Sequence, residues 1–74
     1  MNWYVKATTT PHLNVRATPN GADVGDLLPS TVFAVLDVVY AASGVWAQIA
    51  GGQFDGKWVC LHNTGGRYCE PEGR

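Results

Sequence analysis

Nine glycines and four prolines divide this sequence into short runs rich in Val, Trp, Tyr, Phe and Thr. Both residue types interrupt helices, and the runs between them lack the apolar period of an amphipathic helix. Short β-forming runs separated by turn residues are typical of an all-β sandwich or barrel. The spacing of glycine and proline therefore predicts an all-β fold built from short strands.

The apolar runs predict where the strands lie. We expect strands over 3–7, 13–16, 24–28, 31–40, 45–50, 57–61 and 67–69. Leu13 and Val15 alternate with polar neighbours, so both are expected to face the core. The run 31–40 is apolar on both alternating faces except at Asp37, which predicts a strand buried on both sides that bends through the middle of a small barrel. Residues 1–70 are expected to form this single domain and residues 71–74 a flexible tail.

The length and the charge balance limit what such a domain can do. A chain of 74 residues can form one core, and 46% hydrophobic residues with three Trp can pack it without staples. Five basic residues against six acidic ones, spread along the chain, argue against nucleic acid and against a polybasic membrane surface. No apolar run reaches the length of a membrane span, and no signal peptide is visible. We expect a protein that is cytoplasmic as synthesised or exported by a non-standard route such as phage lysis.

Two cysteines and two histidines are the residues with reactive or metal-binding side chains. Cys60 and Cys69 flank a glycine turn, so a disulfide is conceivable, but two buried free thiols are the preferred interpretation. His62 lies two residues from Cys60, on the same face of an extended strand, which permits a nucleophile–base pair. With His12 they have the atom types of a zinc site, but their spacing matches no common zinc pattern. We therefore predict no catalytic residue, no metal and no cofactor.

Several segments together resemble the bacterial SH3-like domain family over residues 13–61. They are Leu13-Asn14-Val15-Arg16, Val24-Gly25, the Val-rich run that follows, Trp46-Ala47-Gln48-Ile49 and Lys57-Trp58-Val59. Lys57 stands where the family usually has Gly before the Trp. The resemblance implies a partly open SH3-like barrel of five to seven short strands. It also implies an accessory module that holds a cell wall hydrolase on peptidoglycan while another domain does the chemistry.

Trp46 is the residue we expect to mark a binding groove. By strand alternation its side chain points away from Ala47 and Ile49, toward a partly exposed face, although it could instead pack beneath the loop 17–25. The other expected groove residues are Gln48, Tyr4, Tyr40 and Trp58, with Asp23 and Asp26 as acidic neighbours. An aromatic groove with carboxylates suits a peptide that carries an amine or a lysine.

Two functions fit these observations. The first is a non-catalytic binding module that recognises peptidoglycan or a peptide through the aromatic groove. The second is an intracellular or phage-encoded protein–protein interaction domain that uses the same groove or a free strand edge. An open edge would also permit a weak homodimer. A nucleic-acid-binding barrel would need a basic stripe beside its aromatics, which the sequence lacks.

Overall fold

The computed structural model describes residues 3–72, which form a small all-β domain with eight antiparallel strands in one sheet. The strands are β1 (Trp3–Ala7), β2 (Leu13–Arg16), β3 (Asp23–Leu27), β4 (Val32–Ala41), β5 (Gly44–Ala50), β6 (Trp58–Asn63), β7 (Gly66–Arg67) and β8 (Cys69–Glu72). The predicted all-β fold is confirmed, with eight strands in place of the five to seven expected. Among these residues, no helix has the length and apolar character needed to cross a membrane.

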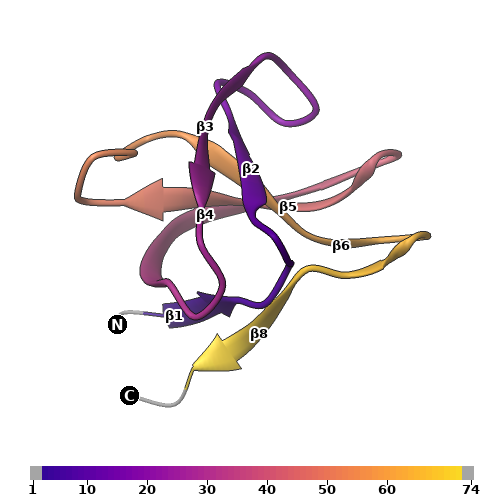
Figure 1. Ribbon diagram of the computed structural model, residues 1–74. Coiled ribbons are helices and arrows are strands. Elements are labelled where there is room, and N and C mark those ends of the chain that lie inside the picture. The colour runs from indigo at the N-terminus through magenta and orange to yellow at the C-terminus, as the bar shows by residue number, and fades with distance from the viewer. Residues whose placement is uncertain (1–2, 73–74) are drawn as a thin grey trace.

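The sheet has the strand order β3-β2-β6-β5-β4-β1-β8, and β7 pairs with β6 beside this path. In Figure 1 the β2–β3 hairpin rises above the β4–β5 hairpin, while β1 and β8 lie together below it. The terminal strands β3 and β8 do not pair with each other, so the sheet is not closed into a barrel. The strands β3 and β8 are therefore open edges of the sheet.

One hydrophobic core lies against the inner face of the sheet. Its buried members come from seven strands and are Val5, Ala7, Leu13, Val15, Leu27, Phe33, Ala47, Ile49, Val59, Leu61 and Cys69. The predicted inward direction of Leu13 and Val15 is confirmed, since 5% and 0% of their surfaces are exposed. Burying such side chains contributes about 1.5–3 kcal/mol each for the larger aliphatic residues.

Strand β4 differs from the prediction of a strand buried on both faces. Leu36 is 62% exposed and Tyr40 is 80% exposed. Val35 pairs with Ile49 and Asp37 with Gln48, so Leu36 is an extra residue in the ladder, a β-bulge. The carboxylate of the exposed Asp37 accepts a hydrogen bond from the backbone N–H of Val38 at 2.8 Å. The bulge ends the alternation that the sequence suggested, and the second half of β4 lies at the surface.

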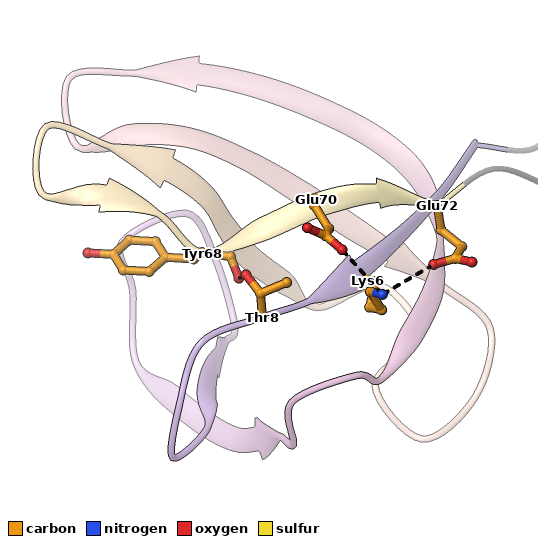
Figure 2. A network of polar contacts seen from close by, with 5 residues as sticks. All are labelled: Lys6, Thr8, Tyr68, Glu70 and Glu72. Carbon is orange, nitrogen blue, oxygen red and sulfur yellow. Dashed lines mark hydrogen bonds and ion pairs between the residues drawn. The ribbon is translucent and has the colours of Figure 1, made fainter.

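The C-terminal residues form a strand where a flexible tail was expected. Strand β8 includes residues 70–72, and it pairs with β1 so that Lys6 lies opposite Glu70. Figure 2 shows the Lys6 ammonium between the two carboxylates of β8, at 3.2 Å from Glu70 and 4.0 Å from Glu72. Pro71 lacks a backbone N–H, which an edge strand tolerates. Residues 73 and 74 of the expected tail lie outside the described residues.

Candidate functional site

A hollow of about 260 Å³ is lined by Trp46 of β5 together with side chains of β2 and β6. We call it the Trp46 hollow. Its lining includes Asn14 and Arg16 from β2, Ser43 from the β4–β5 turn, Asn63 at the end of β6, and Tyr68. Asn14 and Arg16 alternate along β2 with the core residues Leu13 and Val15, so they reach the opposite face. The hollow therefore collects polar side chains from four separate segments around one indole ring.

Trp46 is buried, so the prediction of a partly exposed indole is wrong. Its side chain is 4% exposed, and its Nε1–H donates a hydrogen bond to Ser43 Oγ at 2.9 Å. Asn20, from the loop that was the predicted alternative cover, lines the same hollow. Alternation along the strand did not show that Ser43 of the adjacent turn binds the indole N–H, or that Asn20 lies beside the same hollow.

The β2–β3 loop is held beside the hollow by Arg16. Its guanidinium Nη1 donates to the Gly21 carbonyl oxygen at 2.9 Å, and the Gly21 N–H donates to the Thr18 carbonyl oxygen at 2.8 Å. Asn20 adopts a φ of 58°, in the left-handed region that Asn tolerates well. Asn20 and Gly21 form a residue pair that is typical of tight turns with positive φ. This turn keeps Arg16 in a defined position on the rim.

The thiols are buried and free, which confirms the preferred interpretation of the two cysteines. Burial raises the pKa of Cys60, although hydrogen bonding with the His62 backbone and the charge of Arg16 oppose the rise. Burial, with a smaller contribution from Cys60, raises the pKa of Cys69 from its ordinary 9.0 to about 12. Both thiols are therefore protonated at neutral pH.

The nucleophile–base pair that the spacing of Cys60 and His62 permits is not formed. Cys60 Sγ donates to the backbone carbonyl of His62 at 3.5 Å, while the His62 side chain lines a different hollow. Val45 pairs with His62 and Trp46 with Cys60, so Leu61 is an extra residue in the ladder. Because this bulge interrupts the alternation of β6, the two side chains do not share one face.

His12 lies beside an acidic side chain, that of Asp26. Its Nε2 is 3.4 Å from Asp26 Oδ1, and both side chains are substantially exposed. Within residues 3–72 no group of three or more His, Cys, Asp or Glu side chains is arranged to hold a metal ion. Asp26 therefore faces His12 in place of the acidic role that we predicted for it beside Trp46.

The other predicted groove residues are dispersed over the sheet. Tyr4 lines a hollow with residues of β4 and the β5–β6 loop. Gln48 donates through Nε2 to the Gly56 carbonyl oxygen at 3.0 Å, and Asp23 accepts from the Gly25 N–H at 3.1 Å. Trp58, half-buried, pairs with Arg16 of β2 and with Gln48 of β5. Of the predicted residues, Trp46 is the one that lines the hollow described above.

A second hollow of about 260 Å³, the apolar hollow, lies on another part of the surface. Its lining includes Trp3, Val38, Tyr40, Val45 and Cys69. Trp3 is 42% exposed and Tyr40 is 80% exposed, which makes this the hollow with the more exposed aromatic side chains. Tyr40, predicted to accompany Trp46, belongs here.

Sequence reasoning missed most of the residues that line the Trp46 hollow. The alternation of Leu13-Asn14-Val15-Arg16 already placed Asn14 and Arg16 on the outer face, and this signal could have found them. Ser43 and Asn63 are turn residues whose position depends on how the hairpins fold back. Comparisons with protein families, with characterised proteins and with solved structures found no match to this chain.

Proposed function

We propose that this domain is a non-catalytic binding module of SH3-like architecture that recognises a peptide in the Trp46 hollow, with peptidoglycan peptides as the first candidates. The convergence of polar side chains on one fixed indole carries the proposal. Binding sites typically combine an apolar surface with a few polar groups that orient the ligand. The Trp46 hollow combines Leu13, Trp46 and Cys60 with a larger share of polar side chains, and part of its rim is formed by turns.

The positions of the resembling segments support the SH3-like part of the proposal. The Leu13–Arg16 segment is strand β2, Trp46 and its neighbours lie in β5, and Trp58 begins β6. These three strands are adjacent in the order β2-β6-β5, and each contributes to the lining of the Trp46 hollow. Of the segments that carry the resemblance, Leu13–Arg16 and the one that includes Trp46 contribute side chains to the candidate site.

The chemistry of the hollow favours binding over catalysis. Its thiol, Cys60, has a raised pKa and donates to a backbone carbonyl, so it lacks the activation that a nucleophile needs. The imidazole of His62 lies at the other hollow. The side chains around Trp46 are mainly amides, hydroxyls and a guanidinium, which orient ligands through hydrogen bonds.

Sedimentation with purified sacculi tests the proposal. We expect the wild-type domain to sediment with cell wall and the Asn14→Phe variant, which fills the hollow, to remain in the supernatant. Gln53→Phe is the matched control, because it makes a similar change at an exposed position of the β5–β6 loop. Equal recovery of the wild-type domain with and without sacculi would contradict peptidoglycan binding. Equal sedimentation of all three proteins would place the site elsewhere.

A protein partner bound at the apolar hollow is a second candidate, favoured by the exposure of Tyr40 and Trp3. Exposed aromatic side chains around an apolar surface are common at protein interfaces. Affinity purification from the native host, with wild-type and Tyr40→Ser domains as baits, tests this candidate. A stoichiometric soluble partner retained by the wild-type domain and lost by Tyr40→Ser would support it. A partner retained equally by both would exclude the apolar hollow as its site.

A further inference from the structure

The charges around the Trp46 hollow indicate which kind of peptide group it can accept. Among the described residues, 3–72, the lining contains the guanidinium of Arg16 and no carboxylate. His12 also lines the hollow, and its nearest carboxylate, Asp26, lies outside the lining. The hollow is therefore electropositive in character, and an amine or lysine of a ligand would meet no opposite charge there. The sequence had suggested the opposite kind of ligand, a peptide that carries an amine or a lysine.

The hydrogen bonds already made inside the hollow leave donors for a ligand. An indole N–H can only donate, so Ser43 Oγ is the acceptor in its bond with Trp46, and the hydroxyl proton of Ser43 is left to donate. The backbone N–H of Gly65 donates to Asn63 Oδ1 at 2.7 Å, which leaves the NH₂ group of Asn63. The acceptor atoms of Ser43 and Asn63 are both engaged within the protein.

Arg16 adds charged donors to this set. Its Nη1 is bonded to the Gly21 carbonyl oxygen, and the guanidinium has further N–H groups in a planar fork. The bond to Gly21 holds the fork on the rim, which reduces the side-chain entropy lost when a ligand binds. A carboxylate accepts several hydrogen bonds at once and forms its strongest ones with guanidinium groups.

We infer that the Trp46 hollow binds a carboxylate of its peptide ligand, with Arg16 supplying the charge and Ser43 and Asn63 supplying neutral donors. This inference rests on the proposed function and names the ligand group within it. The carboxylate could be the C-terminus of a peptide or an acidic side chain, and peptidoglycan stem peptides contain carboxylates of this kind. Both sources present the same chemical group, a planar anion that accepts hydrogen bonds from donors on one side of it.

Four N-acetylated tetrapeptides test the inference and distinguish the two sources. The first pair ends in alanine and differs only in a free or an amidated C-terminus. The second pair is amidated and differs only in one glutamate or glutamine. Binding is followed by NMR through the Trp46 indole Nε1–H and the Gly21 amide. We expect one of the two acids to bind about tenfold or more tightly than its neutral counterpart, and added salt to weaken that preference.

Sacculi provide the same comparison on a natural polymer. Their carboxylates are converted to methylamides with carbodiimide and methylamine, and sedimentation is compared with untreated sacculi. Arg16→Gln should abolish the preference for the acid in both assays. Arg67→Gln makes the same charge change at the apolar hollow and should keep the preference. Should Arg16→Gln fail to fold, the comparison of acid and amide with the wild-type protein still decides.

The outcomes separate this inference from the proposed function. Equal binding of acids and amides, or a preference that survives in a folded Arg16→Gln variant, overturns the inference and leaves a peptide-binding hollow. If no tetrapeptide binds, treated and untreated sacculi decide between acid and amide. If neither the tetrapeptides nor either form of sacculi binds, the proposed function fails and the inference fails with it.

Discussion

The Trp46 hollow and the apolar hollow have the same volume, about 260 Å³, but they use their aromatic side chains differently. In the first, the indole is 4% exposed and hydrogen-bonded to Ser43. In the second, Tyr40 is 80% exposed. A buried ring mainly stabilises the fold, whereas an exposed ring is available to a partner. The covering segments, and not the residue type, decide which role an aromatic side chain has.

The largest expected effect separates the two aromatic residues. Trp46→Ala removes a buried ring and should lower the free energy of unfolding by about 3–5 kcal/mol. Tyr40→Ala removes an exposed ring and should change it by about 0.5 kcal/mol or less. Urea unfolding followed by circular dichroism measures both values. Similar losses in the two variants would show that the two hollows do not differ in this way.

Gly44 lies in the chain between Ser43, which lines the Trp46 hollow, and Val45, which lines the apolar hollow, so its substitution should disturb both. Its φ is +133°, and a Cβ atom there would lie 2.6 Å from the His62 carbonyl oxygen and 2.8 Å from Asn63 Cβ. Gly44→Ala is therefore expected to cost about 2–3 kcal/mol through backbone strain and separation of β5 from β6. Gly52→Ala is the control, since its φ is also positive but nothing lies near its added Cβ. Equal unfolding midpoints for these variants would contradict the close approach at Gly44.

Cys60 lines the Trp46 hollow and Cys69 lines the apolar hollow, so the pH dependence of the free energy of unfolding also compares the two hollows. The unfolded chain loses the Cys69 proton near pH 9, whereas the folded protein keeps it until about pH 12. Between these values the unfolded state binds fewer protons, so the free energy of unfolding falls as pH rises, by about 1.4 kcal/mol per pH unit. Urea titrations from pH 8 to 11 should show a flatter decline for Cys69→Ala than for the wild-type protein.

Cys60→Ala is the matched control for that experiment. Burial raises the pKa of the Cys60 thiol too, but hydrogen bonding with the His62 backbone and the charge of Arg16 oppose the rise. The Cys60→Ala substitution should therefore flatten the fall of the free energy of unfolding with pH less than Cys69→Ala does. The reverse order would show that Cys60, in the polar lining, is the more strongly desolvated thiol.

The smallest effect is expected at the ion pairs that border the apolar hollow. Glu70→Gln removes the 3.2 Å contact with Lys6, and because both side chains are partly exposed we expect a loss of about 0.5 kcal/mol or less. The loss should disappear at high salt. Glu72→Gln, whose contact is 4.0 Å, should have the weaker effect. Urea unfolding at two salt concentrations measures both, and a salt-independent loss would point to packing as its cause.

The sequence predicted the elements that depend on local pattern. The bounds of β1 and β2 agree with expectation, and alternation placed Leu13 and Val15 in the core. The extra residues Leu36 and Leu61 could not be predicted, because a bulge arises from the register between two strands and leaves no mark in either one. The same limit explains why the aromatic groove predicted around Trp46 is not formed by the residues expected to line it. Whether Trp46 is covered depends on turns that reach it only after the hairpins have paired.

The pairing of β1 with β8 also determines how the domain would respond to force. These strands lie antiparallel, with Tyr4 opposite Glu72 and Ala7 opposite Cys69, so both ends of the described chain leave from the same side of the sheet. Tension applied at the two ends would load the pair at Tyr4 first and then each following pair in turn. Such a strand pair opens like a zipper, one step at a time, and yields at low force. The strands β2, β5 and β6 that line the Trp46 hollow are not members of this first pair.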